Sequence, residues 1–484
     1  MNALIRIAVV LAVLNCTLGA QTPAGPTDEQ IAAQMDDYVQ RLAGSGFSGV
    51  LLVARNDRVL FAKGAGFANR AMGAANTPDT VFPIGTLTMQ FTAAAILKLQ
   101  MQEKLKIGDT LAQHLAGVPE DKKSITLHQL LTHTAGFAGT LSENPLKLSI
   151  GEYVKQVMQK PLLFTPGERY SESGIGYSLL GIIVEMTAGK SYETFLNENL
   201  FQPAGMTATG YVLPPWKAEQ LAHGYRGNTD WGTLRDRTWG TDGPGWQLRA
   251  SGGILSTAND IFKWYRALMG NDILDEGARN ALFTPYVDIR AAAPMNYGYG
   301  WSVALTPRRT RLAFDNSDNG IFTSDCKLFL DEGVAIIAFA NTSVKPVSKI
   351  TPTAAHIAFG QEYKPPLAEP ERLDREKLKL SPPGAHALAL VDGLGTSAAG
   401  KEDFVNAHFS PSYIRKMGER LPAFLRQDQG RLGRVKFLDA LRSDEDSLEV
   451  TVRSQKTGRR WLWHIKCESE APFRIDSLGL DLAD

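Results

Sequence analysis

The most restrictive feature of the sequence is a run of apolar side chains over residues 91–105 that leaves no broad polar face. On a helix of 3.6 residues per turn, Phe91, Ala94, Leu97 and Leu99 together cover most of the circumference. A surface helix has one apolar stripe, whereas a helix that is apolar almost all round is enclosed by other elements. We therefore predict a buried helix around which the rest of the chain must fold.

Strand patterns lie on both sides of this helix in the sequence. Residues 50–53 and 59–62 predict a β-hairpin around Asn56-Asp57, and residues 327–330 and 334–339 predict a second hairpin. Further helices are predicted over residues 28–42 and 177–188. Strands at both ends of a helical stretch predict an α+β fold with the helical part inserted between them.

The composition changes near residues 363–383, where prolines lie among charged side chains, as is typical of a linker. Beyond it, residues 404–425 predict helices, and period-two alternation over 448–482 predicts a sheet with one apolar face. We therefore predict a separate small α+β domain over residues 384–484. It loosely resembles the cone-shaped folds of the nuclear-transport-factor-2-like kind.

The N-terminus predicts export. Arg6 precedes a short apolar run over residues 7–14, and small residues follow up to Ala20. This order is typical of a secretory signal peptide over residues 1–20, which implies a periplasmic or secreted protein. Asn15 before Cys16 fits a lipoprotein cleavage site poorly. No later stretch reaches the roughly 18 apolar residues of a membrane span, so no transmembrane segment is predicted.

Charge and cysteine content exclude several classes of protein. The 51 Lys and Arg residues balance 51 Asp and Glu residues, which argues against a nucleic-acid partner because such proteins carry a basic excess. Cys326 and Cys467 could form a disulfide or remain as two buried thiols. No cluster has metal-ligand spacing and no glycine-rich loop has phosphate-binding form, so neither a metal nor a cofactor is predicted.

Several separated motifs resemble those of the serine β-lactamase and penicillin-binding-protein superfamily. The resemblance is closest to its class C-like branch, which includes D-alanyl-D-alanine carboxypeptidases and esterases. It implies an antiparallel sheet flanked by helices, with an inserted helical subdomain, over residues 28–362. The matching motifs are Thr80–Gly85 continuing into Gln90–Leu97, Leu130–Gly136, Pro166–Ser171, Gly176–Gly181 and Gly252–Thr257.

The resemblance also places the catalytic positions, and they are degenerate. The family's first motif is Ser-x-x-Lys, a nucleophile with a lysine one helical turn later, but the matching residues here are Thr86 and Met89. The extra methyl group of a threonine crowds the attack path and stiffens its χ1 angle. A thioether is uncharged and cannot take a proton at neutral pH, so it cannot activate the hydroxyl.

The other two motifs are also replaced. Where the class C-like branch has Tyr-x-Asn, alignment on the neighbouring motifs gives Glu172 and Gly174. Where the family has a Lys or His followed by two small residues, the chain has Asp315, with Ser317 as the last of the three. A carboxylate thus stands where a cation would attract a substrate carboxylate.

Other residues have two interpretations. Trp231, Trp239 and Trp246 lie in a stretch rich in Gly, Asp and Thr, where they could contact a ligand or anchor a loop. His133 could act as a base, but its motif resembles a structural turn of the family, which favours a packing role.

The sequence therefore predicts an exported β-lactamase-related pseudoenzyme that retains a cleft for a peptide- or acyl-like ligand. The ligand would be a peptidoglycan peptide or an acyl or ester compound. One alternative is an atypical hydrolase or acyltransferase that uses Thr86 with Glu172, since a buried carboxylate can act as a base. Another is an interaction protein that acts through its C-terminal domain.

Overall fold

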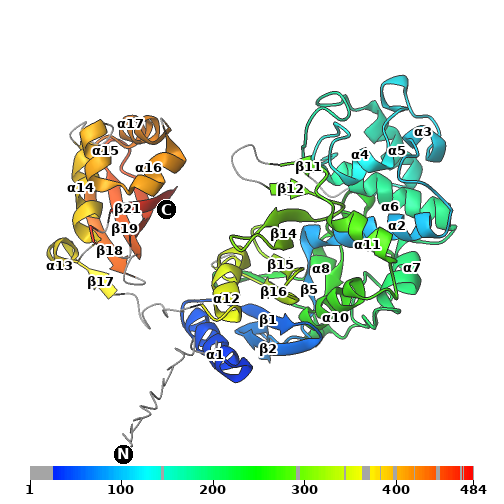
Figure 1. Ribbon diagram of the computed structural model, residues 1–484, viewed down its shortest axis with the longest axis horizontal. Helices are drawn as coiled ribbons and strands as arrows, with labels where there is room; N and C mark the ends of the chain where they lie inside the picture. Colours follow the sequence, from blue (N-terminus) through cyan, green and yellow to red (C-terminus); the bar gives the residue numbers. More distant parts are fainter. Residues whose placement is uncertain are drawn as a thin grey trace, which may run out of the picture.

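Two separately packed units make up the described part of the chain (Figure 1), one within residues 26–361 and one within residues 371–482. The computed structural model describes residues 26–142, 147–289, 295–342, 345–361, 371–381, 383–395, 401–418, 420–442, 447–468, 471–472 and 474–482. The predicted signal peptide lies outside the described residues.

The first unit is built on an eight-stranded antiparallel sheet with the order β11-β12-β13-β14-β15-β16-β1-β2. Both predicted hairpins are present, as β1–β2 and β15–β16. The strands are β1 (Gly49–Arg55), β2 (Arg58–Ala65), β11 (Val287–Asp288), β12 (Met295–Tyr297), β13 (Ser302–Leu305), β14 (Arg311–Asp318), β15 (Thr323–Phe329) and β16 (Val334–Ala340). Short pairs add β3 (Phe67–Asn69) with β4 (Ala74–Ala75), β5 (Phe82–Pro83) with β10 (Leu255–Ser256), β6 (Gly224–Arg226) with β7 (Thr229–Gly232), and β8 (Trp239–Gly240) with β9 (Gly243–Pro244).

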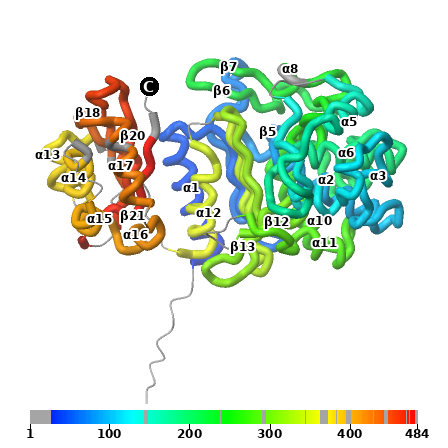
Figure 2. Tube along the Cα trace, turned by 90° about the horizontal axis from the view of Figure 1, so that it is seen from above, coloured from blue at the N-terminus to red at the C-terminus, as the bar shows by residue number. Residues whose placement is uncertain are grey.

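Helices cover both faces of this sheet. Figure 2 shows α1 and α12 together on one side, with α2, α6 and α10 on the other. Neighbouring residues of β1 and β16 alternate between the two cores, so β16 and residues 50–54 of β1 are apolar throughout. The helices are α1 (Asp28–Gly44), α2 (Thr88–Met101), α3 (Leu111–His114), α4 (Leu127–Leu131), α5 (Ile150–Gln159), α6 (Gly174–Ala188), α7 (Tyr192–Leu196), α8 (Leu234–Thr238), α9 (Trp246–Arg249), α10 (Ala258–Met269), α11 (Glu276–Phe283) and α12 (Thr351–Ala358).

The buried helix predicted over residues 91–105 is α2, and it ends at Met101, earlier than predicted. Glu103 adopts a left-handed backbone conformation with φ 57°, which an α-helix cannot continue through. The ring of Phe91 lies 5.3 Å from that of Phe201 and 4.8 Å from that of Trp264, measured between ring centres. Neighbouring aromatic groups therefore cover α2, as its sequence pattern requires.

The second unit is a five-stranded antiparallel sheet with helices packed against it. Residues 371–380, inside the predicted linker, form β17 and α13; β17 pairs with β18, and Leu378 is fully buried in this unit's core. These ten residues of the predicted linker therefore belong to the second unit, and residues 363–370 lie outside the described residues. The elements are β17 (Glu371–Leu373), β18 (Val435–Arg442), β19 (Ser447–Ser454), β20 (Arg460–Cys467), β21 (Ile475–Leu482), α13 (Arg375–Leu380), α14 (Gly384–Gly395), α15 (Glu402–His408), α16 (Pro411–Met417) and α17 (Arg420–Leu432).

Cys326 and Cys467 are buried and are not joined in a disulfide, and each belongs to the core of a different unit. Of the two alternatives left by the sequence, the structure shows two unbridged cysteines. Among the described helices, none is long and apolar enough to cross a membrane.

Separate cores predict separate unfolding. Phe91→Ala should destabilise the first unit by about 3–5 kcal/mol because it removes a fully buried ring, and Val450→Ala should destabilise the second by about 2 kcal/mol. In differential scanning calorimetry of the full chain, each substitution should lower the Tm of one transition only. A single transition that both substitutions shift equally would contradict this prediction.

Candidate functional site

Thr86 lies in a single 3₁₀ turn, Gly85–Leu87, immediately before α2. Gly85 has φ 56°, and a Cβ atom there would lie 2.1 Å from the Ser317 hydroxyl on β14. Only glycine allows this backbone to lie against the strand. The Thr86 hydroxyl donates to the carbonyl of Asn316 at 3.2 Å. The start of α2 is thus fixed against the strand that carries the third motif.

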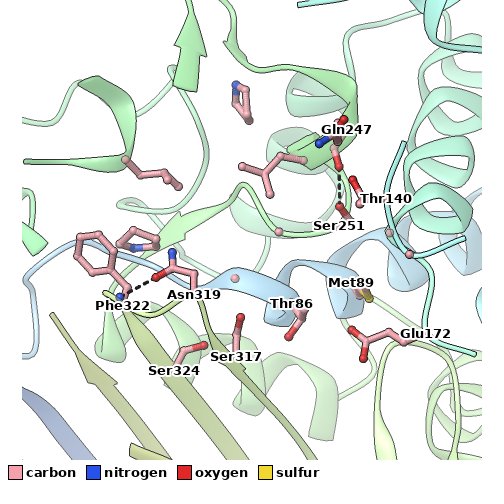
Figure 3. A pocket seen from close by; sticks show the side chains of 18 of the residues that line it. Thr86, Met89, Thr140, Glu172, Gln247, Ser251, Ser317, Asn319, Phe322 and Ser324 are labelled. Carbon is pink, nitrogen blue, oxygen red and sulfur yellow. Dashed lines mark hydrogen bonds between the residues drawn. The ribbon is translucent and has the colours of Figure 1, made fainter. Parts of the chain in front are cut away.

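A cavity of about 400 Å³ opens beside this turn (Figure 3). Five predicted site residues line it, so the structure brings together Thr86, Met89, Glu172, Gly174 and Ser317. The wall is completed by apolar side chains and by hydroxyl and amide side chains, chiefly Leu234, Leu248, Phe322, Thr140, Gln247, Ser251, Asn319 and Ser324. The cavity therefore combines an apolar wall with a few polar groups, the composition of a small-molecule site.

Met89 contacts a buried network of rings. The backbone N–H of Ser173 donates to His133 Nδ1 at 3.0 Å, so His133 carries its proton on Nε2 and donates it to the Tyr297 hydroxyl at 3.1 Å. That hydroxyl lies 3.9 Å from the sulfur of Met89. Burial lowers the pKa of His133 to about 3, so the ring is neutral at pH 7. His133 thus has the packing role that its motif suggested.

The two carboxyl groups of the site lie close enough to interact. Asp315 is on β14 opposite Cys326, on the face of the sheet toward α2. Burial, together with the charge of Glu172, raises the pKa of Asp315 well above its usual value, although a hydrogen bond with Thr86 acts in the opposite direction. Burial also raises the pKa of Glu172. Both groups therefore lose their protons less readily than an exposed carboxyl group does.

Among the described residues that line the cavity, the charge that a side chain can carry is negative. Of the described residues that line it, none is Lys, Arg or His, and Glu172 is the one with an ionisable carboxyl group. The family's third motif would supply a cation at the position of Asp315, where this chain has a carboxyl group that interacts with Thr86 and Glu172.

The three tryptophans lie apart from the cavity lining. Trp246, on α9, is buried and packs against Tyr192 with ring centres 6.4 Å apart. Trp231 packs edge-on against Phe322. Trp239 packs edge-on against Tyr211 and lines a different depression. All three rings therefore pack against other aromatic side chains of the first unit, and none of them is among the residues that line the cavity beside Thr86.

Sequence reasoning did not identify most of the polar cavity wall. Ser251 directly precedes the Gly252–Thr257 motif, and Asn319 follows Ser317 by two positions, so both are close to residues that the resemblance did identify. Gln247 and Thr140 carry no such local signal, because only the tertiary fold brings α9 and the loop before α5 to the cavity.

The neutral state of His133 predicts a pH effect on stability. Because its pKa is lowered in the folded protein, the unfolded chain takes up a proton first, and stability is lost as the pH falls from about 6.5 toward 3. Between pH 7 and pH 5 the loss attributable to this ring should be about 2 kcal/mol. His133→Asn, which suits the backbone φ of 58°, should lower stability at pH 7 but flatten this dependence in urea unfolding.

His356, exposed on α12, provides the control. His356→Asn should leave the pH dependence as in the parent. An unchanged slope in His133→Asn would show that His133 is not buried in a neutral form.

The raised pKa of Asp315 predicts a pH effect on stability that is opposite in direction to the effect of His133. The folded protein holds this proton more tightly than the unfolded chain, so the carboxyl group costs stability as the pH rises above 3.8. Asp315→Asn removes that ionisation and should raise the Tm of the first unit by about 2–4 °C at pH 7.5, with the gain fading toward pH 4. Asp318→Asn, on the exposed end of β14, should leave the Tm unchanged at both pH values. A lower Tm for Asp315→Asn at pH 7.5 would contradict this account.

Comparisons with known proteins agree with this architecture. Penicillin-binding protein 4* of Bacillus subtilis is 26% identical over 66% of this chain and 74% of its own length. The putative penicillin-binding protein PbpX of Bacillus subtilis is 29% identical over 58% of this chain and 69% of its own length.

Among solved structures, a penicillin-binding protein from Bacillus halodurans has a TM-score of 0.57 at 25% identity, covering 66% of this chain and 99% of that one. The structure of an octameric penicillin-binding protein homologue from Pyrococcus abyssi has a TM-score of 0.62 and a sequence identity of 19%. The match covers 93% of this chain and 96% of that one, so the likeness of fold extends over both units. The family described as Beta-lactamase matches residues 31–358. The chain therefore belongs to the Beta-lactamase family, the serine hydrolases that are related to penicillin-binding proteins.

Proposed function

We propose that this protein is an exported member of its family that binds a peptide- or acyl-like ligand in the cavity beside Thr86 without being acylated by it. The observation that carries the proposal is the thioether of Met89 one turn from Thr86, next to the Tyr297 hydroxyl. A catalytic hydroxyl needs a base that accepts its proton, and sulfur in a thioether does not.

The neighbouring carboxyl groups supply no strong substitute. Asp315 shares a hydrogen bond with Thr86, but its raised pKa favours the protonated form, which cannot accept a proton. The Thr86 hydroxyl already donates to Asn316. Loss of members of a catalytic unit typically costs on the order of 10⁴- to 10⁶-fold in turnover, so binding is the function that these residues support.

Export is part of the proposal and rests on residues 1–20, whose order of a basic residue, an apolar run and small residues is that of a signal peptide. A periplasmic or secreted location would expose the cavity to peptidoglycan peptides. The apolar wall and the neighbouring hydroxyl groups suit a ligand with an acyl or side-chain group beside a polar backbone.

One observation favours a second candidate, an atypical hydrolase or acyltransferase. Thr86 and Glu172 both line the cavity, and Asp315, which does not line it, is hydrogen-bonded with Thr86, so a carboxylate could take the hydroxyl proton if it were ionised. The threonine methyl group and the raised pKa values of both acids weigh against it.

Restoring the family pattern tests the proposal. The triple variant Thr86→Ser, Met89→Lys, Glu172→Tyr regains a nucleophile, a base and a phenol at positions that already share one cavity. We expect intact mass spectrometry with benzylpenicillin to show one covalent adduct on the variant and none on the parent.

Thr86→Ala in place of Thr86→Ser, in the same background, should abolish the adduct. A covalent adduct on Thr86 of the parent, or ester hydrolysis by the parent that Thr86→Ala removes, would favour the second candidate instead. Ester hydrolysis that Thr86→Ala leaves unchanged would contradict both.

A further inference from the structure

Four of the five hydroxyl groups that line the cavity share one orientation, and the exception is Ser317. Each of four side chains donates its single proton within the protein: Thr140 to the carbonyl of Ser142, Ser251 to that of Gln247, Ser324 to that of Ile84, and Thr86 either to that of Asn316 or to Asp315. A hydroxyl has one proton and two lone pairs, so each of these oxygens can still accept a hydrogen bond but has no proton left to give.

Glu172 adds a carboxyl group to this set of acceptors. Figure 3 shows its side chain pointing into the cavity, below Met89 and toward Thr86. Among the described residues it has no ion-pair or hydrogen-bond partner for its carboxyl group, and burial raises its pKa. A carboxylate in such surroundings is destabilised unless a positive charge approaches it.

The nearest lysine of the sheet does not reach the cavity. Lys327 pairs with Asp325 on β15, and both alternate with Cys326, the residue opposite Asp315. Alternate residues of a strand point to opposite faces, so this ion pair lies on the side of α12, where Thr351 also donates to Asp325. The described cavity side therefore carries two carboxyl groups without a lysine or arginine between them.

We propose that the cavity is selective for a cationic ligand, an organic amine whose ammonium group lies against Glu172 while its apolar part lies against Leu234, Leu248 and Phe322. This inference rests on the proposed function, namely that the cavity binds without acylation. An ammonium has three donors and no acceptor, which matches Glu172 and the four acceptor hydroxyl groups. It would also provide the counter-charge that Glu172 lacks.

A ligand with a carboxylate fits the same wall poorly. It would bring a second negative charge toward Glu172, and the hydroxyl groups of Thr86, Thr140, Ser251 and Ser324 already donate their protons within the protein. The replacement of the family's cation by Asp315 thus reverses the charge of the ligand that the cavity prefers.

Three compounds of one skeleton test this selectivity: 3-phenylpropylamine, 3-phenylpropanamide and 3-phenylpropanoate, which are cationic, neutral and anionic at pH 7.5. In isothermal titration calorimetry with the full chain, we expect the amine to bind at least about tenfold more tightly than the amide, and the propanoate to bind most weakly. Glu172→Gln should weaken amine binding about tenfold and change amide binding by less than about twofold.

Two matched variants locate the effect. Glu219→Gln removes the same charge at an exposed site away from the cavity and should leave all three affinities unchanged. Thr140→Trp, at an exposed position on the cavity wall, should weaken the amine and the amide alike.

The inference is overturned if the propanoate or the amide binds as tightly as the amine, if Glu172→Gln leaves the preference unchanged, or if none of the three binds. These outcomes are separate from a failure of the proposed function, which would appear as a covalent adduct or turnover by the parent in the mass and hydrolysis measurements.

Discussion

The site depends on the close packing of α2 against the sheet. Two glycines allow it: Gly85 lies against Ser317 of β14, and Gly300, with φ 75°, places its backbone where a Cβ atom would be 2.7 Å from Gln90 of α2. Residues 88–97 of the helix are all buried, so its first turn cannot shift without disturbing aromatic contacts in the core. Thr86 and Met89 are therefore held in position by packing that does not depend on their own chemistry.

The electrostatics of the cavity oppose the stability of the fold. Asp315 and Glu172 are acidic groups partly withdrawn from water and near each other, and both have raised pKa values. A chain selected only for stability would be expected to replace or pair them, since uncompensated charge in such surroundings is costly. Glu172 lines a cavity of about 400 Å³, and Asp315 interacts with Glu172. This arrangement is explained if a ligand supplies the positive charge that the protein does not place there.

Local patterns in the sequence predicted much of this fold. The all-round apolar pattern predicted α2, and turn residues between apolar runs predicted the β1–β2 and β15–β16 hairpins, because these signals are carried by neighbouring residues. Motif spacing placed five residues that line one cavity. The contact between His133 and Tyr297 could not be predicted, since it joins residues 164 positions apart. The direction of each hydroxyl proton and the packing of Trp231 and Trp239 likewise follow from tertiary structure.

The glycine turn before α2 has an evolutionary consequence. Because Gly85 and its contact with Ser317 set the backbone path, exchanging the side chains at positions 86 and 89 leaves the scaffold in place. The catalytic side chains of such a protein can therefore change in evolution while its fold is retained. A few substitutions can then abolish the activity of a hydrolase while its cavity remains. Later substitutions in the cavity wall can adapt that cavity to other small molecules.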